Sequence, residues 1–142
     1  MARYLGATHV VNSLTQDLAA ALREITGDAG IDYVVDTTGR PELLRIAADA
    51  IAVRGTIALV GAARPGTEVT FEVGASLVKG WTFKTVLQGS SVPQTFLPQL
   101  IELWRQGRFP IDKLTKDYTL AQVNEGFADS AAGTTIKPVI VF

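Results

Sequence analysis

The chain has 142 residues and a mass of 15.2 kDa, the size of a single domain. With 47% hydrophobic and 19% charged residues and a net charge of −1, it can form one ordinary core, and its charge gives no reason to expect nucleic acid or an anionic membrane as a partner. It has no cysteine and one histidine, His9, which excludes disulfides, thiolate nucleophiles and Cys-ligated zinc and argues against a His-rich metal site.

The N-terminal part of the chain predicts a short strand followed by a helix. Residues 9–12 form a β-branched run, and Ser13 and Gln16 have the spacing of a capping box. Apolar residues then recur at spacings of four and three, which places them on one helical face: Leu18, Leu22 and Ile25. The glycines within residues 26–30 end this helix.

Two strands of nearly continuous apolar character flank a second helix. They cover residues 31–37 and 55–61, and such strands are typical of parallel sheets covered on both faces. Pro41 suits the first position of the helix between them, where its missing N–H is not needed. The apolar rows of this helix are Leu43, Leu44, Ala47, Ala48 and Ile51. Residues 62–67 predict a loop.

A further strand and a strongly apolar helix follow. The strand is predicted over residues 81–87, and residues 91–94 repeat the capping-box spacing before a helix that ends at Gly107. Burial of the apolar stripe of this helix would contribute on the order of 10 kcal/mol before entropy is subtracted. The stripe consists of Phe96, Leu97, Leu100, Ile101 and Trp104.

The C-terminal part predicts one more helix and a closing strand. A third capping box, residues 119–122, precedes apolar residues at helical spacing: Val123, Phe127 and Ala131. Residues 136–142 predict a strand, and Pro138 indicates an edge position. Regular alternation of strands and helices predicts an α/β fold with a mostly parallel sheet, whose strand ends would place a ligand at one rim.

Several segments in their order along the chain resemble the coenzyme domain of zinc-type medium-chain alcohol dehydrogenases. The likeness extends over essentially all of the chain, and its last segments look most like the aryl alcohol dehydrogenase branch. The segments are residues 5–8, 30–36, 39–40, 55–61, 107–110, 124–127 and 135–138.

Two parts of the family pattern are missing. Family members begin with a zinc-binding catalytic domain, followed by a strand with a Gly-rich phosphate turn and a second strand ending in an acidic residue. None of these occurs here, and there is no G-x-G-x-x-G motif. The resemblance therefore implies a C-terminal portion with an incomplete Rossmann-like parallel sheet, lacking the first two strands and the Gly-rich turn. Zinc would not be bound by this chain.

The resemblance also implies which residues would contact NAD or NADP, with weak or absent binding expected in this chain alone. They are Thr38, Gly39 and Arg40 near the adenosine, Val60, Gly61 and Ala62 beside the nicotinamide ribose, Val86, Leu87 and Gln88 at the carboxamide, and Lys137 near the pyrophosphate. Simpler interpretations stay open. Gly39 and Gly61 could be turn glycines without a ligand role, and Arg40 could be a solvated surface charge. Lys137 could be a charge that prevents an edge strand from pairing with another chain.

The resemblance divides the chain into residues 1–115, a partial NAD(P)-binding domain, and residues 116–142, which belong with the catalytic domain in relatives. Without the first two strands, residues 10–12 could pair with residues 31–37 in a four-stranded sheet whose helices share one face. The other face would lack its covering helices and should find a partner. In relatives the segment 81–88 lies at the dimer seam, so a homodimer through this segment is expected.

Several functions remain open from the sequence. The chain could be an inactive portion of an NAD(P)-dependent alcohol dehydrogenase, a catalytically dead association module, or a chain that pairs with a separate N-terminal zinc-domain chain. A zinc-free quinone reductase relationship is a further alternative. No apolar run approaches the roughly 18 residues of a membrane span and no signal sequence opens the chain, which favours a soluble, cytoplasmic protein.

Overall fold

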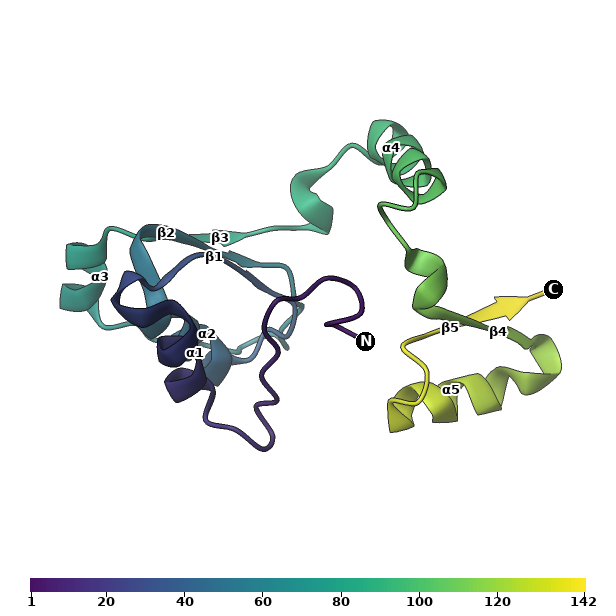
Figure 1. Ribbon diagram of the computed structural model, residues 1–142, viewed down its shortest axis with the longest axis horizontal. Helices are drawn as coiled ribbons and strands as arrows, with labels where there is room; N and C mark the ends of the chain where they lie inside the picture. Colours follow the sequence, from purple (N-terminus) through teal and green to yellow (C-terminus); the bar gives the residue numbers. More distant parts are fainter. The chain divides into compact units, whose positions relative to one another are not determined.

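The computed structural model describes residues 1–142, which form two compact units, Met1–Ser91 and Val92–Phe142 (Figure 1). The division expected after residue 115 concerns the domains of a longer enzyme, and it stays a prediction. No helix of the structure is both long and apolar enough to cross a membrane.

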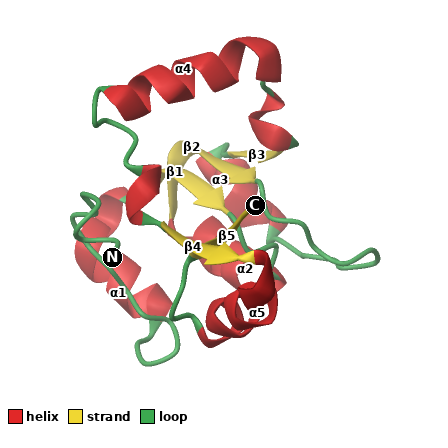
Figure 2. Ribbon diagram, turned by 90° about the vertical axis from the view of Figure 1, so that its right-hand side faces the viewer, coloured by secondary structure: helices red, strands yellow, loops and turns green.

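The first unit contains a three-stranded parallel sheet in the order β1-β2-β3 (Figure 2). Its strands are β1 (Ile31–Asp36), β2 (Ile51–Leu59) and β3 (Thr82–Thr85), and its helices are α1 (Leu18–Thr26), α2 (Pro41–Ala50) and α3 (Val73–Lys79). This arrangement confirms the expected α/β class with a short parallel sheet. It also confirms Pro41 as the first residue of its helix.

The core of the first unit lies between α2 and one face of the sheet. Leu44 and Ala47 of α2 are buried against Ile51 and Ile57 of β2, and Ile57 has no exposed surface. Burying such a side chain contributes about 1.5–3 kcal/mol. The apolar face of α2 therefore packs against the side chains that β2 directs to this side of the sheet.

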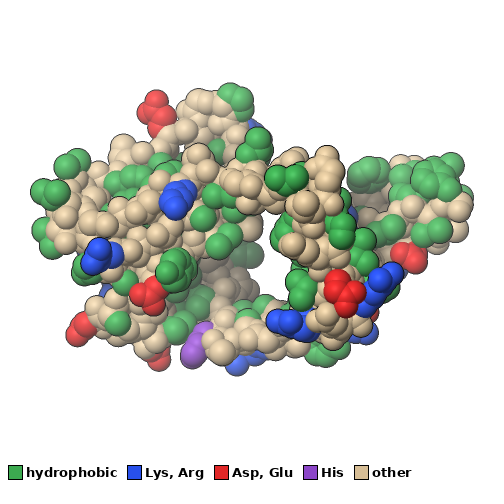
Figure 3. Space-filling model, turned by 90° about the horizontal axis from the view of Figure 1, so that it is seen from above, with side chains coloured by type: hydrophobic (Ala, Val, Ile, Leu, Met, Phe, Trp, Pro, Cys, Tyr) green, Lys and Arg blue, Asp and Glu red, His purple; other side chains and the backbone are tan.

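The opposite face of the sheet is uncovered within this unit, as expected. Tyr33 and Val35 point away from the core side and are 80% and 67% exposed. Hydrophobic side chains accordingly reach the molecular surface at many places (Figure 3).

The predicted strand over residues 10–12 is wrong, and with it the four-stranded sheet. These residues pair with no strand, so β1 is an edge of a three-stranded sheet. The capping box at Ser13 is also wrong. Asn12 instead accepts from the backbone of Leu14, and α1 begins later, where the Asp17 side chain accepts from Ala20 N at 3.0 Å.

Two further features of the first unit were not predicted. One is the helix α3. It begins after Glu72, whose carboxylate caps the helix by accepting from the backbone N–H groups of Gly74 and Ala75. The other is the start of β2, which lies at Ile51 and not at residue 55. Ile51 pairs with Ile31 and Thr56 pairs with Tyr33, and the register shifts between these two pairs, where Arg54 has a φ of 63°.

The second unit combines two helices with a two-stranded parallel sheet. Its elements are α4 (Pro93–Arg105), β4 (Thr115–Thr119), α5 (Val123–Ala132) and β5 (Lys137–Val141). The capping box at Thr119 and Gln122 is confirmed, as is the edge position of Pro138, since β5 pairs only with β4.

Two expectations for the second unit need correction, and one of its strands was not predicted. Ser91 does not cap α4; its hydroxyl donates to Gln88 O, and Val92 is the N-cap without a side-chain bond. The apolar stripe of α4 is not buried, since its larger side chains are between 42% and 56% exposed: Phe96, Leu97, Ile101 and Trp104. The strand β4 was not predicted, because Tyr118 is its only buried residue among polar neighbours.

Candidate functional site

Three turns lie at the carboxyl edge of the first sheet. Because β1, β2 and β3 are parallel, their C-terminal ends meet at the same edge, which is where α/β folds bind ligands. Residues 37–40 follow β1, residues 60–62 follow β2 and residues 86–88 follow β3. Nine of the ten cofactor-contacting residues expected from the sequence belong to these turns.

Asp36, the last residue of β1, organises the first turn. One carboxylate oxygen accepts from Thr38 N at 3.0 Å and from Thr38 Oγ1 at 2.7 Å, and the other accepts from Gly39 N at 2.9 Å. The residue is only 9% exposed, so these three bonds satisfy a carboxylate that is largely shielded from water. Asp36 was not among the site residues predicted from the sequence, although an aspartate followed by Thr-Thr-Gly is a typical signal of such a turn.

The first two turns are in direct contact. The N–H of Gly61 donates to Asp36 O at 3.0 Å, and a Cβ atom on Gly61 would lie only 2.5 Å from the carbonyl carbon of Thr37. Gly39, with φ of +64°, likewise approaches the backbone of Ala63. Both glycines are therefore required for the close approach of the two turns.

The third turn continues from β3. The N–H of Val86 donates to Leu59 O at 2.9 Å, which extends the pairing with β2 by one residue. The Leu87 side chain is exposed, and Gln88 has a positive φ of 49°. This turn thus presents an apolar side chain and backbone groups beside the end of β2.

Arg40 places a cation beside the first turn. Its guanidinium contacts Glu42 Oε1, with Nε at 2.7 Å and Nη2 at 2.5 Å, and both side chains are about half exposed. The backbone N–H of Glu42 and, next, the Arg40 guanidinium lower the pKa of the Glu42 carboxyl. Such an exposed pair is weak, so the guanidinium can be redirected by a ligand at little cost.

Lys137, the tenth residue expected to contact the cofactor, belongs to the second unit. It is the first residue of β5, its side chain is exposed and its N–H donates to Leu114 O at 3.0 Å. Its place beside the other nine residues stays a prediction.

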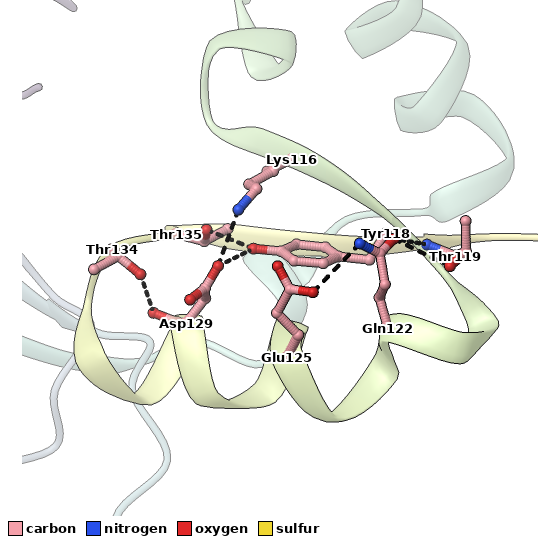
Figure 4. A network of polar contacts seen from close by, with 8 residues as sticks. All are labelled: Lys116, Tyr118, Thr119, Gln122, Glu125, Asp129, Thr134 and Thr135. Atoms are coloured by element: carbon pink, nitrogen blue, oxygen red, sulfur yellow. Dashed lines mark hydrogen bonds and ion pairs between the residues drawn. The ribbon is translucent and has the colours of Figure 1, made fainter.

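A polar network in the second unit was not predicted (Figure 4). The hydroxyl of Tyr118, a residue only 2% exposed, donates to Asp129 Oδ2 at 2.6 Å and lies 2.8 Å from Thr135 Oγ1. Lys116 Nζ lies 3.0 Å from the same carboxylate oxygen. Tyr118 and then Lys116 lower the pKa of Asp129, while Tyr118 and Asp129 together raise the pKa of Lys116. The network fastens α5 to β4.

A hollow of the first unit lies away from these turns. It has a volume of about 500 Å³ and is lined by α2, α3 and the aromatic pair Phe71 and Trp81. Lys79 closes one side by donating from Nζ to Asp49 O at 2.7 Å, and none of the ten expected cofactor residues lines it. No group of three or more His, Cys, Asp or Glu side chains is placed to hold a metal ion.

Residues 1–105 match the family model described as zinc-binding dehydrogenase. Among curated proteins, the geraniol dehydrogenase of Castellaniella defragrans is 34% identical over 143 residues, covering all of this chain and 38% of the relative. The NDMA-dependent alcohol dehydrogenase of Amycolatopsis methanolica is 33% identical over 141 residues, covering 96% of this chain and 38% of the relative.

Solved structures agree with this relationship. The benzyl alcohol dehydrogenase of Acinetobacter calcoaceticus is 45% identical with a TM-score of 0.92, covering 98% of this chain and 38% of the solved chain. An alcohol dehydrogenase zinc-binding domain protein of Burkholderia ambifaria is 48% identical with a TM-score of 0.91, covering 98% of this chain and 37% of the solved chain. The chain thus spans well under half the length of these relatives, and it belongs to the zinc-binding dehydrogenase family as a counterpart of the C-terminal portion of its alcohol dehydrogenases.

Proposed function

We propose that the chain forms the part of an NAD(P)-dependent alcohol dehydrogenase that contacts the nicotinamide cofactor during hydride transfer between an alcohol and an aldehyde. The observation that carries this proposal is the contact between residues 37–40 and 60–62 at the carboxyl edge of a parallel sheet. The family relationship supports it, because the matched relatives are alcohol dehydrogenases.

The residues at this edge suit one part of a dinucleotide. Ala62, Leu87 and Gln88 are exposed, and their backbone groups can hydrogen-bond an amide or a ribose. Arg40 offers a guanidinium for stacking or phosphate contact. The chain has no Gly-rich turn to hold the pyrophosphate. It therefore fits the adenosine and nicotinamide ends better than the phosphates between them.

Each part of the edge would have a distinct role. When bound, the nicotinamide supplies the hydride acceptor or donor. Asp36 fixes the turn that positions Thr38, Gly39 and Arg40 beside the adenosine. Residues 60–62 position the nicotinamide ribose, and residues 86–88 orient the carboxamide through their backbone. Lys137 approaches the pyrophosphate in the complete protein.

With no cysteine and one histidine, the chain lacks the donor set of a zinc site. We propose that the isolated chain binds NAD or NADP weakly and does not turn over alcohols by itself. The printed names of the matched relatives favour an alcohol dehydrogenase over a quinone reductase.

The proposal is tested by titrating the ¹⁵N-labelled chain with NAD to millimolar concentration and recording amide shifts by NMR. Shifts confined to residues 38–40, 60–62 and 86–88 are expected. Arg40→Ala should weaken binding about tenfold, or about 1.4 kcal/mol. The matched control Arg23→Ala removes an exposed cation from α1 and should leave the affinity unchanged. Absence of shifts at these turns would refute the assignment.

A second candidate function is association without cofactor. It is favoured by the exposed apolar side chains of the sheet face, Tyr33 and Val35. In that case NAD would cause no shifts at any concentration while the chain still forms stable complexes.

We also propose that two copies associate through segment 81–88. The strand β3 pairs only with β2, so its other edge is free. The short helix before it carries three apolar side chains, Val73, Leu77 and Val78, that are 79–82% exposed. A two-fold pairing of β3 edges would bury backbone groups and cover apolar surface near them.

A further inference from the structure

The hollow between α2 and α3 lies at the sheet edge opposite the three turns. It is lined by the end of α2, which precedes β2, and by Trp81, which precedes β3, so it adjoins the amino ends of these parallel strands. Its volume of about 500 Å³ falls within the range of small-molecule sites, about 300–1,000 Å³. The apolar side chains of α3 offered above for association do not line it: Val73, Leu77 and Val78. A ligand here would therefore be bound apart from both the cofactor turns and that apolar surface.

An aromatic wall forms one side of the hollow. The rings of Phe71 and Trp81 meet edge to face with their centroids 5.0 Å apart, and the Phe83 centroid lies 5.7 Å from that of Phe71. Trp81 and Phe83 pack against the core that contains Ile57. Because the core fixes these rings, the wall is formed before any ligand binds, and it suits the flat face of another aromatic group.

The two helix ends that meet at the hollow are already satisfied by the chain itself. Lys79 Nζ donates to carbonyl groups of the last turn of α2, at 2.7 Å to Asp49 O and 3.4 Å to Ala48 O. At the start of α3, the Glu72 carboxylate accepts from two backbone N–H groups. The cation therefore offsets the negative end of one helix and the carboxylate offsets the positive end of the other, so neither needs a ligand.

Two charged side chains at the hollow have no partner. Arg45 and Asp49 both line it from α2, and neither side chain forms an ion pair or hydrogen bond within the chain. Glu42, one turn earlier on α2, is already paired with Arg40. A cation four residues before an anion is the less favourable order for pairing along a helix. A ligand can therefore contact both Arg45 and Asp49 without breaking an existing bond.

We propose that this hollow binds an aromatic α-amino acid in its zwitterionic form. The Arg45 guanidinium holds the ligand's carboxylate, the Asp49 carboxylate holds its ammonium group, and its ring lies against Phe71 and Trp81. The two charges of an α-amino acid are adjacent, as are the two free charges one turn apart on α2. An aromatic anion or an aromatic cation would leave one of the protein's charges without a partner. The proposal does not depend on cofactor binding.

The test follows the two tryptophan indole N–H signals of the ¹⁵N-labelled chain by NMR during titration with L-phenylalanine to millimolar concentration. Trp81 lines the hollow, whereas Trp104 belongs to the second unit and is the internal control. Only the Trp81 signal is expected to shift. Hydrocinnamate lacks the ammonium group and phenethylamine lacks the carboxylate, and each should bind at least about tenfold more weakly than phenylalanine, a difference of about 1.4 kcal/mol.

Two variants that keep the side-chain shape assign the contacts. Arg45→Gln should weaken the binding of phenylalanine about tenfold and leave that of phenethylamine, which has no carboxylate, unchanged. Asp49→Asn should likewise weaken phenylalanine and leave hydrocinnamate unchanged. The matched controls Arg64→Gln and Asp32→Asn change exposed residues of the same unit that do not line the hollow, and they should bind phenylalanine like the parent chain. Circular dichroism checks the fold of each variant.

Several results would overturn the proposal. They are an unmoved Trp81 signal, equal shifts of the Trp81 and Trp104 signals, and equal losses in a variant and its matched control. Hydrocinnamate binding as tightly as phenylalanine would mean a site for aromatic anions, and phenethylamine doing so would mean a site for aromatic cations. Because no cofactor is present, none of these results bears on NAD binding.

Discussion

Asp36 shows how one buried carboxylate can shape a candidate site. It accepts three hydrogen bonds within the turn that follows it, and it stands at the point where the first two turns meet. The two glycines that permit this contact, Gly39 and Gly61, have packing roles that do not depend on a ligand. The turn can therefore be preformed before any cofactor binds.

Replacing Asp36 should destabilise the first unit. Asp36→Ala leaves two backbone N–H groups and one hydroxyl without their acceptor, at an expected cost of about 2–4 kcal/mol in the free energy of unfolding. Urea denaturation measures this loss. Asp32→Ala, at an exposed position of the same strand, is the matched control and should cost less than about 0.5 kcal/mol. Equal losses in the two variants would show that the turn does not depend on the carboxylate.

Arg54 marks a strained position in β2. Its φ of 63° is rare for a residue with a Cβ atom and ordinary for glycine. Arg54→Gly should raise the free energy of unfolding by about 0.5–1 kcal/mol, reduced by the extra freedom of glycine in the unfolded chain. In contrast, Arg45→Gly in the middle of α2 should lower it by about 1 kcal/mol. Thermal unfolding measures whether each variant is more or less stable than the parent chain. A lower free energy of unfolding in Arg54→Gly would contradict the strain at this position.

At the scale of elements, α5 is held to β4 by side chains and not by a large core. Gly126 of α5 lies beside the Tyr118 ring, and a Cβ atom there would be in ordinary van der Waals contact with it at 3.5 Å. The Tyr118 hydroxyl then reaches Asp129 on the next turn of α5. The hydrogen bond of one phenol thus joins the strand to the helix.

The second unit should lose stability in acid. The pKa of Asp129 is lowered in the folded chain, so between its folded value and the ordinary value of about 3.9 the unfolded state binds more protons. Its stabilising effect is complete above about pH 4 and disappears as the pH falls through the lowered pKa. Carboxyl NMR titration measures this pKa directly.

The Tyr118→Phe variant tests the cause of this shift. It removes the hydroxyl that contributes most to the lowered pKa, so the Asp129 titration should move toward the ordinary value. Thr119→Ala, which changes a neighbouring residue of β4 outside this carboxylate's contacts, should leave the titration in place. An unchanged Asp129 pKa in Tyr118→Phe would assign the shift to Lys116 and Thr134.

At the scale of the whole molecule, we expect exposed strand edges to govern association. If two copies pair through β3, the solution mass at micromolar concentration is that of two 15.2 kDa chains. The N–H of Val86 bonds to β2, so the N–H of Thr85 faces the free edge. Thr85→Pro should keep the fold and give a single-chain mass, because proline is tolerated where the N–H faces solvent.

Lys84→Pro provides the contrast for this test. The N–H of Lys84 faces β2, so its loss should destabilise the first unit itself. Sedimentation and circular dichroism separate the two results. A dimer that survives Thr85→Pro would place the contact outside β3.

The sequence by itself determined the features that depend on near neighbours in the chain. The strands near residues 31–37 and 55–61 follow from apolar runs, and α2 begins at Pro41 because proline suits a first helical turn. The capping box of Thr119 and Gln122 could also be predicted from the sequence, because the two residues are only three positions apart.

Tertiary structure alone decided the features that depend on distant partners. Residues 10–12 have strand-like side chains, yet they form no strand because a strand needs a neighbour to bond its backbone. The stripe of α4 has the pattern of a buried face but remains half exposed, because a pattern specifies a face and not what covers it. The contact between the turn after β1 and the turn after β2, where Gly61 N donates to Asp36 O, exists only in the folded chain. Local pattern fixes the elements, whereas burial and pairing arise from contacts between segments far apart in the chain.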